Sequence, residues 1–256
     1  MDSVLKFAQW ALTHAKKAPS GASLALDAKK CCTDPWEYLY GTSGKKCTQS
    51  LLDAQYEKYY KGWGWSRSEY NKATAGWADR GVMVADCQGL LDAYCTLELD
   101  QKTDKNAQSC YADWCTDKGR IKDISGPYVI GEALFVYSSS KGKMTHVGWI
   151  CGWDKDGEPL AVEERGLSYG CVITRVKSRD WTHRGLMTKR FAYDADESVS
   201  DKVVLKITSP LMRGSEIASL QVALNGMGYP CGRADGICGN DTLDGIRSFC
   251  KAHEGV

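Results

Sequence analysis

The stretch "ADCQGLLDAYC", Ala85 to Cys95, predicts a helix that begins beside an aspartate and a cysteine. Asp86 can serve as the N-cap, because its short carboxylate accepts hydrogen bonds from free N–H groups of the first turn. Apolar residues follow at the three-to-four spacing of one buried face, namely Leu90, Leu91, Tyr94 and Cys95. Cys87 lies at the top of that face, at the positive end of the helix dipole. This position predicts a lowered thiol pKa if a histidine is also near.

Cys87 can equally be one more buried thiol, since the chain has twelve cysteines. An even number could form disulfides in a secreted protein, but the N-terminus lacks a secretory signal. The CxxC pairs of a zinc ribbon are also missing, so we expect no metal and no other cofactor. Most of the thiols are expected to be small buried side chains in a reducing cell. A free Cys87 would leave at least one further cysteine unpaired.

Helices precede strands along the chain. Helical spacing of apolar residues covers residues 3–17, 48–60, 66–77, 86–99 and 106–118. After residue 126 come short segments rich in Val, Ile, Tyr and Trp: "ALFVYS", "HVGWICGW", "PLAVEE", "GCVITRV" and "LMTKRFAY". Helices followed by strands with short connections predict an antiparallel sheet and an α+β domain over residues 1–192.

A polar, acidic segment without hydrophobic period follows at 193–204 and is expected to be a linker. Residues 205–256 then contain two helical patterns, "SEIASLQVALNGMGY" and "NDTLDGIRSFCKA", separated by the turn-rich "PCGRADGICG". A unit of this size must be compact and mostly helical to fold. We therefore expect a small C-terminal domain.

A base for Cys87 can be sought among four histidines. His146 opens the strand "HVGWICGW", where alternation places Gly148 on the same face and leaves room for another element or a substrate. If the loop "DKDG" is a two-residue turn, Glu163 becomes the diagonal neighbour of His146. A carboxylate on one imidazole nitrogen leaves the other nitrogen for a thiol, as in a Cys-His-acid triad.

The third residue of the triad is left open by this reasoning. Glu164 points to the opposite face of the strand in the register with a two-residue turn, but a bulge would exchange the two glutamates. His146 can also be a half-buried strand histidine, and Glu163 a solvated residue of the sheet. His183, in "WTHRG", lies beyond the triad strands and is expected to be structural.

The balance of charges argues against two classes of partner. The chain has 33 Lys and Arg against 32 Asp and Glu, so it has no excess positive charge to follow nucleic acid or an anionic bilayer. No run approaches membrane-spanning length. We expect a monomer made in the cytosol that binds neither nucleic acid nor membrane.

These residues resemble the NlpC-type peptidoglycan cysteine peptidases, which have a papain-like fold. The family's Asp-Cys-Ser-Gly-Leu signature is similar to "DCQGL", and its His-Val-Gly strand is similar to "HVGW". Its third polar position matches Glu163 in "AVEERG", and "YLYG" places Tyr38 where members have a tyrosine beside the thiol. The segments "WEYLYGTSGKKCTQSLLDAQ" and "ERGLSYGCV" resemble the subgroup in phage and prophage lysins. Gln88 departs from the usual Ser, and many members have His, Asn or Gln in place of Glu163.

The C-terminal residues are similar to the three-helix peptidoglycan-binding domain. The matches include Leu220-Gln221, Leu224-Asn225, Gly228-Tyr229 and Asp235-Gly236. Cys250 and Cys238 replace residues of the family pattern. Most matched positions are structural, so they indicate no particular ligand contact.

The resemblance implies a cell-wall hydrolase that cuts a stem-peptide amide, next to γ-D-glutamate, with the C-terminal domain holding it on peptidoglycan. Cys87 would be the nucleophile, His146 the base and Glu163 the residue that orients it. The backbone N–H of Cys87 and the Tyr38 hydroxyl would stabilise the oxyanion, and Asp86 and Gln88 would help to bind substrate. An endolysin of this kind would reach the wall through a phage-type membrane pore.

Three other functions remain open on the sequence. An N-acetylmuramoyl-L-alanine amidase would use the same Cys87 and His146 but cut between the sugar and L-alanine. A non-catalytic wall-binding protein would keep both domains without activity. A zinc-stapled, cysteine-rich protein would differ from both by its metal content.

Overall fold

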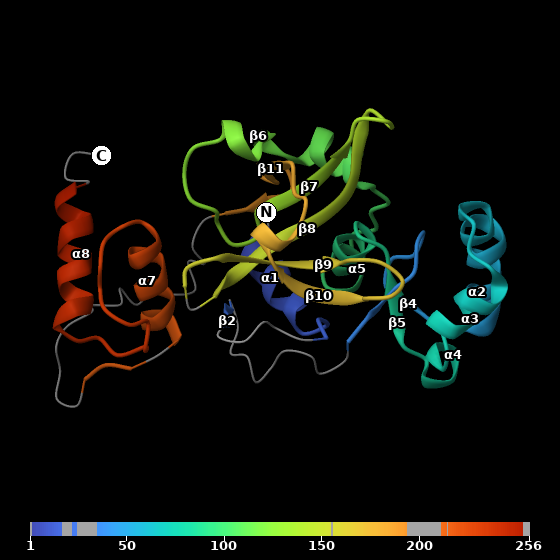
Figure 1. Cartoon of the computed structure of the whole chain (residues 1–256), viewed down its shortest axis with the longest axis horizontal. Helices are drawn as coiled ribbons and strands as arrows, with labels where there is room; N and C mark the ends of the chain where they lie inside the picture. The colour runs from blue at the N-terminus through green and yellow to red at the C-terminus, as the bar shows by residue number, and fades with distance from the viewer. Residues whose placement is uncertain are drawn as a thin grey trace.

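The computed structural model describes residues 2–16, 22–24, 35–154, 156–193, 211–213 and 215–252, with the backbone alone at 22–24 and 215–216. The fold combines helices with an antiparallel sheet (Figure 1), as the sequence predicts. None of the helices in these ranges is both long and apolar enough to cross a membrane.

The sheet is built mainly from consecutive strands joined by short connections. Its order is β10-β9-β8-β7-β11-β6, and β2 (Ala22–Leu24) adds to β8. The bounds are β6 Thr116–Arg120, β7 Ala133–Ser138, β8 Lys143–Asp154, β9 Pro159–Glu164, β10 Cys171–Arg175 and β11 His183–Leu186. Every pairing is antiparallel. Strands β7 and β9 coincide with the predicted segments "ALFVYS" and "PLAVEE".

One face of the sheet is covered by α1 (Val4–Leu12) and α5 (Gly89–Leu97). Val147, Trp149 and Cys151 of β8 point to these helices, as strand alternation predicts. The ring of Phe7 from α1 meets Trp149 edge-on at 4.9 Å, an arrangement that favours aromatic pairs. Burial of these large side chains anchors both helices to the sheet and so places the start of α5 against β8.

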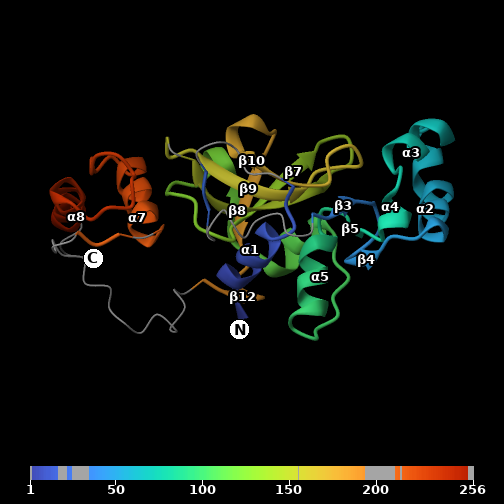
Figure 2. The same ribbon diagram turned by 90° about the horizontal axis from the view of Figure 1, so that it is seen from below.

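A second group of helices lies beyond α5. It contains α2 (Gln49–Gln55), a π-helical turn (Tyr56–Tyr60), a 3-10 turn (Lys61–Trp63), α3 (Arg67–Ala73) and α4 (Trp77–Arg80). Thr48 caps α2, and Ser66 forms a capping box with Glu69 at α3. Figures 1 and 2 both place α5 between this group and the large sheet. A small sheet, formed by β3 (Glu37–Tyr38), β4 (Lys45–Lys46) and β5 (Met83–Ala85), leads into the "DCQGL" segment.

The helices expected at 3–17, 66–77 and 86–99 are shorter than predicted, since α1, α3 and α5 end at Leu12, Ala73 and Leu97. Two further predicted elements differ in kind or are divided. The helix expected at 106–118 is limited to α6 (Ala107–Ser109) and a π-helical turn (Cys110–Trp114), after which β6 begins. The segment "LMTKRFAY" is divided between the end of β11 and β12 (Phe191–Ala192), which pairs with β1 (Asp2–Ser3). In both places pairing with strands distant in sequence overrides the local period.

The described part of the C-terminal segment contains α7 (Ser215–Gly226) and α8 (Asn240–Ala252). Gln221 of α7 is buried, and its amide donates to Thr242 at the start of α8 at 2.8 Å and accepts from Gly236 N–H at 2.9 Å. This buried amide holds the turn-rich segment between the helices. No third helix is present among residues 211–213 and 215–252, so the three-helix expectation is not met within them.

Most of the predicted linker, 194–204, lies outside the described residues. Tyr193, its expected first residue, is attached to the N-terminal domain, because its hydroxyl donates to Gly131 O and accepts from Met187 N–H. Cys31 and Cys32 also lie outside the description. Of the described cysteines only Cys250 is exposed, and free thiols include Cys47, Cys87, Cys95, Cys110, Cys115, Cys231, Cys238 and Cys250.

Candidate active site

Asp86 connects the small sheet to the start of α5. Its carboxylate accepts from Gly89 N–H at 2.7 Å and from Gly41 N–H at 2.9 Å. Its own N–H donates to Thr42 O at 2.8 Å. A Cβ at Gly89 would lie 2.0 Å from the same carbonyl oxygen, so a side chain cannot be accommodated there. α5 begins at Gly89 with Gln88 in the N-cap position, so the helix starts later than predicted and Asp86 is not its N-cap, although its carboxylate binds the first helical N–H. The "DCQG" segment holds Cys87 in the turn directly before the helix.

The Cys87 thiol is buried, with 7% of the residue exposed. Burial raises the thiol pKa, and the Asp86 carboxylate raises it further. Hydrogen bonds from the N–H groups of Val147, Gln88 and Cys87 itself lower it. The net direction is upward, so the predicted lowering of the pKa is wrong. Desolvation thus outweighs the three backbone hydrogen bonds, which favours the protonated thiol.

The contact with Val147 N–H brings the thiol to the backbone of β8, one residue after His146, whose side chain is not part of the lining of the cleft at Cys87. His146 lies on the opposite side of the strand from Val147 and is half-buried, with 14% of its side chain exposed. Its Nε2 is 2.7 Å from a carboxylate oxygen of Glu163. The other ring nitrogen, Nδ1, is left for a proton transfer.

The register that brings Glu163 to His146 is the predicted one, although the turn is different. Asp154 N–H donates to Glu158 O, which leaves residues 155–157 in the connection instead of two, and Gly157 has a φ of 81°. A bulge between Ile150 and Gly152 then removes the one-residue shift. Glu163 consequently returns to the predicted diagonal position.

Glu163 is fully buried and has further partners besides the imidazole. Arg179 binds both of its oxygens, through Nε at 2.8 Å and Nη2 at 3.0 Å, and the Thr174 hydroxyl donates at 2.8 Å. Burial alone would raise the carboxyl pKa, but the hydrogen bonds from His146 and Arg179 lower it to about 2. Glu163 is therefore ionised at neutral pH.

Trp181 holds the imidazole from one side. Its ring is stacked on His146 with a centroid distance of 5.4 Å and an angle of 16° between the planes. A Cβ at Gly148 would lie 2.9 Å from the Trp181 ring and 3.1 Å from the Glu163 Cβ. Gly148 thus leaves room for the side chains of Trp181 and Glu163. From the sequence we expect this space to be used by another element or by a substrate, and here other elements of the protein use it.

Glu163→Gln should reduce stability in a pH-dependent way. The folded pKa of about 2 lies below the ordinary value of 4.5, so the ionised carboxylate stabilises the fold above the unfolded pKa. This contribution, roughly 3 kcal/mol, is lost as pH falls toward the folded pKa. Denaturant unfolding of both proteins should show a difference that is largest near neutral pH and shrinks below about pH 4.5. A difference that stays constant down to pH 2 would contradict the assignment.

Glu164, the alternative third residue, points away from His146. It is fully buried, and neither of its carboxyl oxygens has a hydrogen-bond partner among the residues that the structure describes. Burial raises its pKa well above the ordinary value, and Glu37 raises it further. Glu163 and Glu164 are neighbours in β9, so their side chains point to opposite faces of the sheet, and that of Glu164 is directed away from the imidazole.

An open cleft of about 830 Å³ lies at the thiol. Its lining includes all the sequence-predicted residues on the Cys87 side, namely Tyr38, Asp86, Cys87 and Gln88. Tyr38 in β3 is paired with Ala85 of β5, and burial together with the nearby Cys87 and Asp86 raises the pKa of its phenol. The phenol therefore keeps its proton and can donate a hydrogen bond.

Gln88 lies in the cleft lining but is only 1% exposed. Its Nε2 donates to Asp92 at 3.3 Å, and Asp92 also accepts from the Thr103 hydroxyl and Lys105 N–H. In this conformation Gln88 supports the loop ahead of α6, and its predicted contact with substrate remains a prediction.

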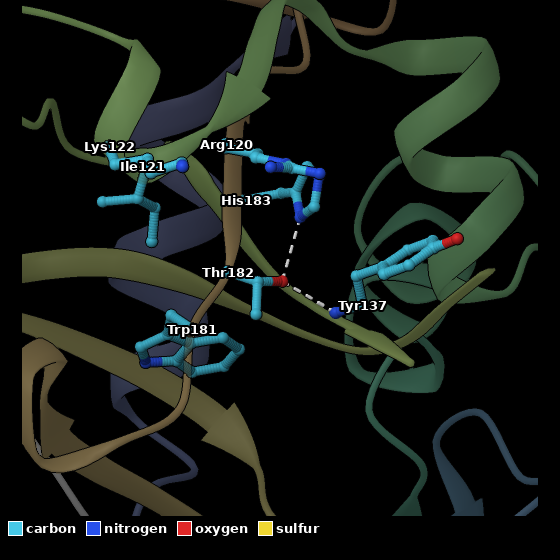
Figure 3. Close-up of a pocket in the computed structure, with 7 residues that line it drawn as sticks. All are labelled: Arg120, Ile121, Lys122, Tyr137, Trp181, Thr182 and His183. Atoms are coloured by element: carbon cyan, nitrogen blue, oxygen red, sulfur yellow. Dashed lines mark hydrogen bonds between the residues drawn. The ribbon is translucent and has the colours of Figure 1, made fainter. Parts of the chain in front are cut away.

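A second cavity of about 600 Å³ is lined by residues that the Cys87 cleft does not share: Arg120, Ile121, Lys122, Tyr137, Trp181, Thr182 and His183 (Figure 3). His183 lines it and contacts the Thr182 hydroxyl through Nδ1 at 2.9 Å. Burial and Arg120 lower the His183 pKa. His183 has no carboxylate partner among the described residues, unlike His146.

Sequence reasoning missed Arg179, Thr174 and Trp181. The "WTHRG" segment predicts a structural role for His183, but nothing in its local pattern indicates that the Trp181 ring reaches His146. No group of three or more His, Cys, Asp or Glu side chains that could bind a metal occurs in the part of the chain that the structure describes. Comparisons with protein-family models, curated proteins and solved structures found no match for this chain.

Proposed function

We propose that the protein is a thiol-dependent amide hydrolase with Cys87 as nucleophile, His146 as base and Glu163 as the orienting acid. The observation that carries the proposal is the contact between the Glu163 carboxylate and Nε2 of His146. His146 lies on β8 directly before Val147, whose N–H contacts the Cys87 thiol. The cleft at the thiol gives access to a substrate.

The steps follow from the protonation states. Nδ1 of His146 takes the proton of Cys87 as the sulfur attacks the substrate carbonyl, and Glu163 stabilises the imidazolium that forms. The imidazolium then gives its proton to the leaving amine, which departs and leaves a thioester. Water, deprotonated by His146, hydrolyses the thioester and restores the thiol.

The developing oxyanion needs donors that are already in place. The backbone N–H of Cys87 and the protonated Tyr38 hydroxyl are the candidates, since both lie at the thiol. A donor of this kind typically contributes about 3 to 4 kcal/mol to catalysis. Asp86 would act mainly by fixing the turn that presents the N–H.

The proposed substrate is the stem peptide of peptidoglycan, cut next to γ-D-glutamate. This part of the proposal rests on the resemblance of "DCQGL", "HVGW" and "YLYG" to the NlpC-type peptidases, together with the contact of the Cys87 thiol with β8 and of His146 with Glu163. The C-terminal segment would bind the wall as a peptidoglycan-binding domain. Such a protein would act as a monomer that reaches the wall after release through a membrane pore.

Mass spectrometry of digested cell wall tests this function. A new amino terminus inside the stem supports an endopeptidase, whereas a new terminus at L-alanine would identify the amidase alternative. Intact wall after prolonged incubation with the full chain would contradict both and favour a wall-binding protein.

Removal of the C-terminal segment should separate binding from catalysis. A chain ending after Asp194 should cleave a soluble stem-peptide fragment within about twofold of the full chain, yet lose about 10- to 100-fold on intact sacculi, because tethering raises local substrate concentration. Both rates are measured side by side by product release. An equal loss on both substrates would mean instead that the segment supports the catalytic domain.

A further inference from the structure

The cleft at Cys87 has a cationic side that the proposed mechanism does not use. Lys141 and Lys143 line the cleft, and both are exposed. Within the described residues, neither ammonium group has a carboxylate within salt-bridge distance. Lys105 also lines the cleft, but its ammonium group forms an ion pair with the Asp113 carboxylate, with Nζ and Oδ2 2.7 Å apart. Lys141 and Lys143 are thus the cations of the cleft available to a ligand.

The two lysines are carried by an ordered turn. Lys141 N–H donates to the backbone oxygen and the side chain of Ser138, and Gly142 has a φ of 62° that closes the turn. The next residue after Lys143, Met144, donates its N–H to the Gln108 side chain at 2.9 Å. The β7–β8 turn is therefore tied to α6 and presents both amines from a fixed backbone.

Other cleft residues limit where a negative group can lie. Asp86 also lines the cleft, but its carboxylate is directed to the N–H groups of Gly41 and Gly89. Tyr40 and Trp63 supply an aromatic part of the lining, with ring centroids 4.8 Å apart, and Trp63 is 53% exposed. An anion would avoid Asp86 and the aromatic rings and would be most stable beside the lysines.

We propose that Lys141 and Lys143 form a subsite for a carboxylate of the substrate, so that the enzyme selects acidic over amidated peptides. The inference rests on the proposed function and adds a specificity determinant to the same cleft. A stem peptide offers such a group in the free α-carboxylate of its γ-linked D-glutamate and in a carboxylate of its diamino acid. Each ammonium group can pair with a carboxylate oxygen of a substrate held in the cleft.

Three synthetic stem-peptide fragments test the subsite. One has all carboxylates free, one has the glutamate α-carboxylate amidated, and one has the diamino-acid carboxylate amidated. The full chain should cleave the free acid with a kcat/KM about 10- to 100-fold higher than that of one amidated fragment. Lys141→Ala with Lys143→Ala should remove this preference by lowering kcat/KM for the free acid, and arginine at both positions should restore it in part.

Lys122→Ala with Lys72→Ala is the matched control, since Lys122 lines the second cavity, Lys72 lines a third, and their joint loss lowers the net charge by two, as in the double variant. It should leave the preference within about twofold of the unmodified protein. Equal cleavage of all three fragments by the full chain would overturn the carboxylate subsite while leaving the hydrolase intact. Cleavage of none of them, with wall also intact, would instead overturn the proposed function.

Discussion

Cys87→Ala should abolish wall hydrolysis while the protein remains folded, with a loss of at least about 1,000-fold in product release, because nothing else in the cleft can form the thioester. The substitution removes a single sulfur from a residue directly before α5, whose position depends on Asp86 and Gly89. Activity is measured by release of soluble fragments from purified sacculi, and folding by circular dichroism and denaturant unfolding.

Cys95→Ala is the control for a buried thiol on the helix that follows Cys87. Cys95 is fully buried and contacts Arg190, so its loss should lower stability without changing the rate per folded molecule. If Cys87→Ala lyses wall nearly as well as the unmodified protein, Cys87 is not the nucleophile. If Cys95→Ala were inactive although folded, the reacting thiol would have been misidentified.

His146→Ala should cost a comparable factor, about 1,000-fold or more in kcat, because burial keeps the Cys87 thiol protonated and no other base lies beside Val147 on that strand. A thiol with a strongly lowered pKa would depend less on the base. The raised pKa of Cys87 therefore makes the expected loss larger. The measurement is single-turnover cleavage of a soluble stem-peptide fragment between about pH 6 and pH 9.

His183→Ala is a closely matched comparison, since His183 lies near Trp181 on the neighbouring cavity. It has no contact with Glu163 and should retain activity within about threefold. Equal losses for the two alanine variants, with stability unchanged in both, would mean that the base has been assigned to the wrong histidine.

Local sequence was sufficient for the elements that carry Cys87 and His146. Asp86 accepts a hydrogen bond from Gly89 N–H at the start of α5, and alternation in "HVGWICGW" separates His146 from the buried Val147 face. These features depend on residues within a few positions of one another. The period of apolar residues therefore reveals them without any knowledge of the fold.

The contact between His146 and Glu163 is predicted correctly from the sequence, but the two-residue turn on which the prediction rests is not the turn in the structure. The connection at 155–157 is one residue longer than the assumed turn, and the bulge after Ile150 compensates. A bulge is selected by how the whole strand pairs and packs, so the local sequence alone could not indicate it.

Only the tertiary structure decided the electrostatics of the site. Arg179 and Trp181 reach Glu163 and His146 because the chain after β10 returns over the same face of the sheet. The thiol pKa is raised because helices and sheet together exclude water from Cys87. The period of apolar residues in the sequence determined which side chains face inward. The proton affinity of a buried group depends instead on all the groups packed around it, and these come from distant parts of the chain.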